Sequence, residues 1–314
     1  MRVGIMIEGQ EGLTWERWFR LAQAAEDMGY ESLCRSDHLT GLAGDPRRPS
    51  LETWTSLAAI AARTRRIRFG PVVSPITFYH PTVLAKMALA IDLLSGGRLD
   101  LGLGAGWNEP EHRMFGVPMP PLGERMDRLE CAARHVRALG GGRPVTLAQP
   151  HYPLASAELH PAPTHGRLRL LIGGRGERRT LRIAAEFADE WNVTRVDPAG
   201  FRHKRSVLER HCAAVGRDPA SIARSLMVPL AIGRDRADVG RRLAAARAVF
   251  PGLPEDEAAW RRQGFLAGTP EEVLAALDEW RSAGVERVLL QMLDQDDLGA
   301  LDLFAARVLP GLAR

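Results

Sequence analysis

The sequence predicts a (β/α)8 barrel of the TIM type, and two features of the chain indicate this fold. Short apolar, strand-like segments alternate with amphipathic helical segments along all 314 residues. Eight such strands fill the chain, a number that favours a closed barrel over an open, doubly wound sheet. No low-complexity linker or shift in composition divides the sequence. We therefore expect one domain over residues 1–314.

The predicted strands are apolar runs of four to seven residues, most of them bounded by glycine or polar turn residues. The fourth run alternates leucines with other residues and then passes into glycines at alternate positions. The strands are expected over residues 3–7, 32–36, 67–73, 99–103, 168–172, 190–193, 226–232 and 287–292.

The predicted helices carry start and stop signals at their ends. Thr14 is a suitable N-cap for the first helix, and Gly29 ends it. Pro81 stands in the first turn of the third helix. Thr269, followed by Pro270 and Glu272, predicts a capping box. The helices are expected over residues 15–28, 51–63, 81–94, 123–138, 181–187 and 201–215, up to about 263, from 269 onward, and at the C-terminus.

Composition excludes several classes of function. Hydrophobic residues make up 45% and charged residues 25% of the chain, as in ordinary water-soluble domains. No apolar run is long enough to span a membrane, and the N-terminus lacks the features of a secretory signal. Cys34, Cys131 and Cys212 lie far apart, which indicates reduced thiols and a cytoplasmic location. The net charge of +4 is spread along the chain without a basic, aromatic-rich run, so nucleic-acid binding is not expected.

Chemistry in a barrel of this kind is expected where the strands end, at their carboxyl termini. Asp37 and His38 directly follow the second predicted strand and form a candidate acid–base pair. The alternative is a capped loop with a surface histidine. The position of the pair beside a glycine-rich strand end favours a functional role.

The glycine-rich stretch after the fourth strand is predicted to form the floor and one wall of a cofactor pocket. Gly102, Gly104 and Gly106 leave room for a flat ligand, and Trp107 bounds that space. A dinucleotide fingerprint is disfavoured because Trp107 occupies the place of the third glycine and Pro110 is expected in a loop. The remaining alternative is that the glycines only relieve crowding inside the barrel.

A second glycine-rich turn follows the fifth strand and is predicted to hold a phosphate. Its glycines permit a tight turn with exposed N–H groups, and the next helix directs its N-terminal dipole to the same place. Arginine side chains there could add charge-assisted hydrogen bonds. The alternative is a plain strand–helix turn whose arginines face water. The predicted phosphate-binding residues are Gly173, Gly174, Arg175, Gly176, Glu177 and Arg178.

Three further patterns in the sequence bear on the expected site and its chemistry. Residues 140–167 are rich in Gly, Pro and His and form a long connection, for which we expect a lid-like insertion. Glu111 and His112 lack further ligands at metal-site spacing, so no metal is expected. No serine or cysteine stands in a nucleophile-elbow sequence, which leaves acyl-enzyme chemistry without a candidate.

With these residues in view, the chain resembles the luciferase-like monooxygenases and, among them, the oxidoreductases that depend on the deazaflavin coenzyme F420. The matching stretches are distributed in order over almost the whole length. They are SDHL at 36–39, RFGPVVSPITFYHPTVLAKMALAIDLLSGGRLDLGLGAGWNEPEHRMFGVP at 68–118, LLIGGRGERRTLRIAAEFADEWN at 170–192 and GTPEEVLAAL at 268–277. The resemblance implies a barrel that binds a flavin or deazaflavin at the carboxyl ends of its strands.

The resemblance also implies roles for individual residues. His38 would donate or accept the proton, with Asp37 near the reactive ring. A non-proline cis peptide within Pro71, Val72 and Val73, expected at Pro71–Val72, would back the ring. The other implied positions are Ser74 at the ring edge, Gly106, Trp107 and Asn108 lining the cavity, residues 173–178 at the phosphate, and Trp107, Glu111, His151 and Tyr152 as substrate contacts.

Two departures from related sugar-phosphate dehydrogenases narrow the expected chemistry. Those enzymes place a glutamate acid directly after the glycine-rich strand, where this chain has Trp107. They also carry a tryptophan shortly after the Asp-His pair, where this chain has Gly41 and Leu42. Sugar-phosphate oxidation is therefore not expected.

Three functions remain open from the sequence. The preferred hypothesis is hydride transfer between F420 and a small organic substrate, with His38 managing the proton. The alternatives are a monooxygenase that takes reduced FMN from a separate reductase, and a flavin-binding protein without catalysis. Flavin and deazaflavin share ring shape and phosphate, so the sequence barely separates them. By analogy with the family we expect a homodimer.

Overall fold

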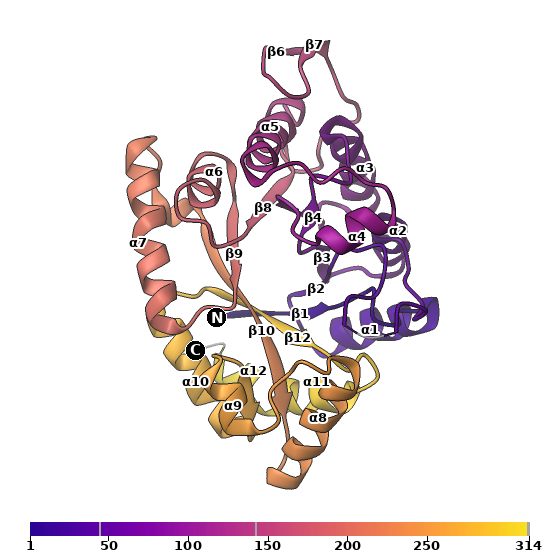
Figure 1. Ribbon diagram of the computed structural model, residues 1–314, viewed down its shortest axis with the longest axis vertical. Helices are drawn as coiled ribbons and strands as arrows, with labels where there is room; N and C mark the ends of the chain where they lie inside the picture. Colours follow the sequence, from indigo (N-terminus) through magenta and orange to yellow (C-terminus); the bar gives the residue numbers. More distant parts are fainter. Residues whose placement is uncertain (44, 142, 313–314) are drawn as a thin grey trace.

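The computed structural model describes residues 1–43, 45–141 and 143–312, and it has the predicted barrel architecture. Parallel strands lie side by side in the order β3-β2-β1-β12-β10-β9-β8-β5-β4, and helices surround them on the outside (Figure 1). The barrel strands are β1 (Arg2–Ile7), β2 (Ser32–Arg35), β3 (Arg68–Pro71), β4 (Ser74–Pro75), β5 (Asp100–Gly104), β8 (Arg169–Gly173), β9 (Glu190–Thr194), β10 (Ala223–Ile232) and β12 (Arg287–Met292).

The barrel closes where β3 and β4 meet β5. A parallel bridge joins Phe69 to Leu99, and Ser74 then pairs with Leu103 on β5. The strand predicted over 67–73 is therefore split into two short pieces that serve two neighbours, β2 and β5.

A non-proline cis peptide lies between these two pieces, at Val72–Val73. The prediction of a cis bond at Pro71–Val72 is wrong by one residue. Pairing with β2 continues past Pro71, because the Val72 N–H still donates to the Arg35 carbonyl oxygen at 2.8 Å. The chain changes partner only after Val72.

The helices begin and end close to the predicted positions. Thr14 caps α1, and Thr269 forms the predicted capping box with Glu272 at the start of α10. The helices are α1 (Trp15–Asp27), α2 (Thr53–Arg63), α3 (Pro81–Ser95), α4 (Glu109–Met114), α5 (Leu122–Leu139), α6 (Thr180–Phe187), α7 (Pro198–Ala214), α8 (Arg236–Val249), α9 (Glu257–Arg262), α10 (Pro270–Ala283), α11 (Leu298–Arg307) and α12 (Leu309–Leu312), with a 3₁₀ turn at Pro219–Ser221. None of them, within the described residues, is both long and apolar enough to cross a membrane.

Three elements depart from the prediction. The segment after β5, expected as a loop, contains the short helix α4, in which Pro110 stands in the first turn. A short strand β11 (Leu266–Gly268) pairs with β10. Residues 140–167 include an antiparallel pair, β6 (Val145–Leu147) and β7 (Leu154–Ala157), which lies beyond the end of α5 at the top of the view (Figure 1).

The apolar core of the described residues has three parts, one of which packs α8 and α9 against β10 and β11 around Val239, Leu243 and Trp260. A large cluster packs between the strands and the helices. A small cluster built from Met6, Cys34, Val72, Leu171 and Leu289 is drawn from different strands of the barrel. Large, fully buried side chains fill the interior. Polar groups are therefore expected at the carboxyl ends of the strands, where the site lies.

Candidate active site

A histidine and a glutamate from two different strand ends form the centre of the site. His38 follows β2, and Glu111 lies on α4 after β5. The His38 Nδ1 atom lies 2.8 Å from Glu111 Oε2, and the Leu39 N–H donates to Glu111 Oε1 at 2.6 Å. The glutamate side chain is 1% exposed and the histidine 13%. Both oxygens of one buried carboxylate therefore fix the loop that carries the histidine.

This pairing sets the tautomer and the charge of His38. A carboxylate accepts, so Nδ1 carries the hydrogen and Nε2 is the atom left for chemistry. Burial by itself lowers the pKa of His38, but the hydrogen bond and charge of Glu111, with other nearby acids, raise it above the usual histidine value. The raised pKa favours the protonated imidazole, in which Nε2 also carries a hydrogen that it can deliver.

Asp37 is adjacent to His38 in the sequence, but its side chain accepts hydrogen bonds from a different set of polar residues. The Tyr79 hydroxyl donates to its two carboxylate oxygens at 3.1 and 3.0 Å, and the Ser74 hydroxyl also donates to it. Burial raises the pKa of Asp37, and these hydrogen bonds oppose the rise. Asp37 thus joins the end of β2 to the start of β4 and holds the loop from which His38 projects.

The alternate glycines after β5 serve the barrel wall. A Cβ at Gly104 would lie 2.5 Å from the Val73 side chain, and one at Gly173 would lie 2.7 Å from it. A Cβ at Gly102 would collide with the Pro71 carbonyl oxygen. These glycines make room for the segment at Pro71–Val73, so the expectation that Gly102 and Gly104 accommodate a flat ring directly is wrong. The crowding alternative accounts for both.

The residues that follow these glycines line the mouth of the barrel. Gly106 has a φ of +79°, and a Cβ there would lie 2.7 Å from Thr77 Oγ1. The Trp107 ring is 67% exposed and meets His38 edge to face at 5.9 Å between centroids. Asn108 is buried and caps α4 by accepting from the Glu111 N–H. Trp107 thus stands next to the histidine, whereas Asn108 positions the helix that carries Glu111.

The turn after β8 has the geometry expected of an anion-binding turn. Gly174 has a φ of +134°, and α6 begins without a side-chain cap. Within the described chain, the backbone N–H groups of Arg175, Gly176, Glu177 and Arg178 donate to no other backbone group. Arg178 is exposed. Glu177 faces the other way and pairs with Lys204 and His203, which lower the pKa of its carboxyl.

His151 and Tyr152 lie in the connection between β6 and β7 and are half-buried. Tyr152 packs edge to face against His80, the N-cap residue of α3, at 5.0 Å, and against His135 on α5 at 6.2 Å. The backbone of His160, further along the insertion, accepts from Lys86 on α3. The segment 140–167 therefore contacts α3 and α5, and its role as a lid stays a prediction.

Sequence reasoning missed the hydroxyl group of Tyr79 at the same end of the barrel. Tyr79, the partner of Asp37, follows the third strand in the sequence SPITFYHP, and its position after a strand end was the available signal. Glu8 follows β1 and accepts hydrogen bonds from Gln10 at 2.8 Å and from Gln291 on β12. The pairing of Glu111 with His38 had no local signal, because 73 residues separate them.

His112, for which no metal-binding role is expected, has a structural role that follows from its contacts. Its Nδ1 donates to the Asn108 carbonyl oxygen at 2.7 Å, and its Nε2 lies 2.7 Å from Thr77 Oγ1. It therefore ties α4 to the loop after β4. Among the described residues no group of three or more His, Cys, Asp or Glu side chains is arranged to hold a metal ion.

Comparison with known proteins identifies relatives of the whole chain. The family model for luciferase-like monooxygenases matches residues 1–287. A phthiodiolone/phenolphthiodiolone dimycocerosates ketoreductase of Mycobacterium kansasii is 27% identical over 333 residues, covering 85% of this chain and 88% of the relative. An F420-dependent glucose-6-phosphate dehydrogenase of Nakamurella multipartita is 27% identical over 316 residues, covering 93% and 91%.

A solved structure has the same fold. An F420-dependent secondary alcohol dehydrogenase in complex with an F420–acetone adduct superposes with a TM-score of 0.83 at 19% identity, covering 99% of this chain and 98% of the other. This likeness confirms the predicted barrel.

Proposed function

The chain belongs to the luciferase-like monooxygenase family, and on that basis we propose that it transfers a hydride between coenzyme F420 and a carbonyl substrate. Enzymes of this family are oxidoreductases, as are the relatives described above. The observation that carries the proposal is the buried hydrogen bond between His38 Nδ1 and Glu111 at the mouth of the barrel. It directs Nδ1 to the carboxylate and leaves Nε2 for the substrate, beside an exposed aromatic ring.

The residues of this mouth fit a tricyclic cofactor with a phosphate-bearing tail. The uncapped start of α6 and the free N–H groups of the turn before it suit a phosphate, with Arg178 adding positive charge. The segment at Val72–Ser74 and the loop at Gly106 would hold the ring. F420, when bound, supplies or accepts a hydride and does not react as a one-electron carrier.

The chain's own contribution to reduction of a carbonyl is the proton. His38 Nε2 would deliver it to the carbonyl oxygen, and the raised pKa of the imidazole favours the protonated form that this step needs. The Glu111 carboxylate holds Nδ1–H and stabilises the charge while the proton is held. In the reverse direction the same nitrogen would take the proton of an alcohol.

The surroundings of His38 favour a substrate with an apolar body. Leu39, Trp107 and Met114 are all large apolar residues with exposed side chains, and they follow or flank the two strand ends that supply the dyad. Exposed apolar surface next to a catalytic group is a site for burying the apolar part of a ligand. The relative named as a ketoreductase supports a ketone as the reacting group.

The proposal is tested by His38→Ala. We expect turnover with reduced F420 to fall about 10²–10⁴-fold, while the affinity for F420 stays nearly unchanged, because the imidazole acts on the proton and not on the cofactor. Steady-state rates and a fluorescence titration of F420 measure the two effects. His165→Ala, at the opposite end of the barrel, is the matched control and should retain full activity. Equal activity of His38→Ala and wild type would remove His38 from the mechanism.

The second candidate is an FMN-dependent monooxygenase, which the family's own description favours. Both cofactors would use the same turn and ring site, so the affinities must decide between them. Anaerobic titration of the protein with F420 and with FMN, following absorbance, is the discriminating measurement. Tight binding of FMN and none of F420 would overturn the preference for the deazaflavin.

A further inference from the structure

The amino end of the barrel, opposite the candidate active site, holds a second concentration of charged side chains. Arg287 at the start of β12 is completely buried there. Its Nη1 lies 3.0 Å from Glu190 Oε2, its Nε 2.9 Å from Glu31 Oε2 and its Nη2 3.2 Å from Asp100 Oδ2. These ion pairs close the centre of the barrel. The charges of the three carboxylates outweigh burial and raise the pKa of Arg287, so it stays charged.

Further arginines surround Arg287 and contact the same carboxylates. Asp100 is contacted by Arg68 and Arg169 as well as by Arg287, and Glu190 by Arg169 as well. Arg2 reaches Glu31 only at 3.4 Å. Four arginines therefore stand on three carboxylates, which leaves an excess of positive charge in a partly desolvated place.

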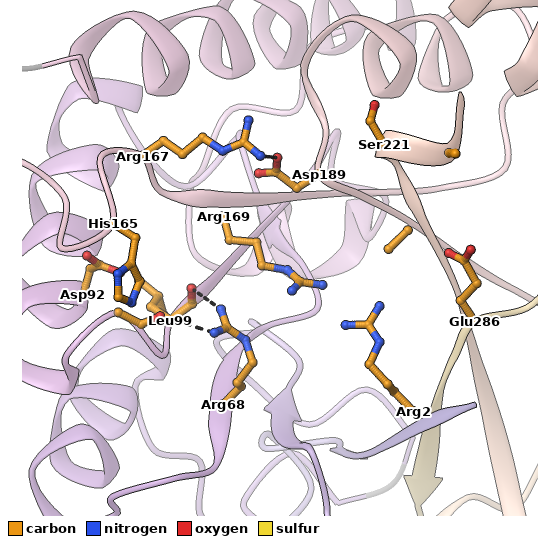
Figure 2. A pocket seen from close by; sticks show the side chains of 13 residues that line it. Arg2, Arg68, Asp92, Leu99, His165, Arg167, Arg169, Asp189, Ser221 and Glu286 are labelled. Atoms are coloured by element: carbon orange, nitrogen blue, oxygen red, sulfur yellow. Dashed lines mark hydrogen bonds and ion pairs between the residues drawn. The ribbon is translucent and has the colours of Figure 1, made fainter. Parts of the chain in front are cut away.

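The outer arginines face a cavity of about 400 Å³. Figure 2 shows the guanidinium groups of Arg2, Arg68 and Arg169 directed from three strand starts towards the same hollow. The Nε of Arg169 is buried and lies 3.4 Å from Asp100 Oδ1, without forming a hydrogen bond among the described residues. Like charges that converge on one space repel each other unless a negative group lies between them.

The rim of the cavity carries Arg167 and three carboxylates, those of Asp92, Asp189 and Glu286. Asp92 Oδ2 accepts from the Thr164 N–H at 2.8 Å. Asp189 is shared by Arg167 and Arg137, at 2.8 and 2.7 Å. Arg224 holds the Glu286 carboxylate through a side-chain ion pair and through its N–H at 3.0 Å. Each rim carboxylate is therefore already held by a group other than Arg2, Arg68 and Arg169.

We propose that this cavity binds a small multivalent oxyanion, either a phosphate group or a polycarboxylate. Guanidinium groups match both through paired, charge-assisted hydrogen bonds. The site is distinct from the cofactor turn. Arg169 begins β8 and Gly173 ends it, so the two anion sites lie at opposite ends of one strand, about 13 Å apart along it.

The test measures binding of inorganic phosphate and of citrate by calorimetry at low ionic strength. The experiment uses an Arg178→Gln background, because that substitution weakens anion binding at the cofactor turn. In this background we expect saturable binding. Adding Arg2→Gln and Arg167→Gln should weaken it at least tenfold. Both residues are at the rim of the ion-pair network, so the barrel stays folded, as circular dichroism and thermal unfolding without anion will verify.

Two results separate the possible ligands and decide the proposal. Tighter binding of citrate than of phosphate indicates a polycarboxylate, and the reverse order a phosphate group; both support the site. A second, independent readout is a rise in the unfolding temperature with anion concentration, which binding to the folded state requires. Absence of saturable binding, or binding unaffected by the two rim substitutions, would overturn the proposal.

Discussion

The two ends of the barrel treat charge in opposite ways. At the amino end, Arg287 is buried among three carboxylates and every one of its nitrogens faces an acid. At the carboxyl end, His38 meets one acid at one nitrogen and leaves the other nitrogen unused by the protein in the described structure. At the amino end, the paired charges close the barrel. At the carboxyl end, the imidazole nitrogen that has no partner among the described residues can act on a substrate. The imidazole nitrogen without a protein partner in the described structure therefore marks the candidate active site.

Breaking the closed end should have the largest effect. Arg287→Ala leaves Glu190, Asp100 and Glu31 buried without their shared cation, and we expect the free energy of unfolding to fall by about 3–5 kcal/mol. Urea unfolding followed by circular dichroism measures it. The exposed Arg262→Ala is the matched control and should change stability little. A loss no larger than that of the control would show that the network does not hold the barrel.

Breaking the pairing at the open end should act on catalysis and on its pH dependence. Glu111→Gln keeps a hydrogen bond but removes the charge that raises the pKa of His38. We expect turnover to fall about tenfold to a hundredfold, less than for loss of the imidazole itself. A proton donor loses activity as the pH rises through its pKa, so the alkaline limb of the rate profile should move to lower pH. An unmoved limb would show that Glu111 does not set the charge of His38.

The smallest effect should come from weakening α4, the helix that supports the carboxyl end of the barrel. Asn108→Ala removes the N-cap of α4, the helix that carries Glu111, and we expect a loss of about 1 kcal/mol of stability. Asn108→Asp preserves the cap and serves as the control. Thermal unfolding and F420 titration on both variants distinguish support from direct contact. A large loss of F420 affinity in Asn108→Ala, with unchanged stability, would instead make Asn108 a cofactor contact.

Much of the fold was accessible from the sequence because strand and helix periods are local. The strand at Arg287–Met292 and the capping box at Thr269 were predicted as found. The helix α4 was missed, although Asn108 followed three residues later by Glu111 is a start signature and proline is favoured in a first turn. That pair of signals was outweighed by the glycines before it.

The site was only partly accessible, for a physical reason. His38 could be found because it directly follows a strand, but its partner lies on another strand end and meets it only through barrel closure. Relief of crowding was one role expected for the glycines after β5, but the crowding side chain could not be identified, because Gly104 and Gly173 accommodate Val73, which belongs to a third segment. Contacts between distant segments carry no periodic pattern in the chain.

One carboxylate links two loops at the open end. Glu111 receives both the ring of His38 and the N–H of Leu39, so the connection after β2 and the connection after β5 are clasped at a single point. Displacing α4 therefore displaces the proton donor with it. The connection between α4 and α5, residues 115–121, supplies no partner to the Glu111 carboxylate in the described structure. An enzyme built this way can change the substrates that it admits while the proton donor His38 keeps its position relative to Glu111.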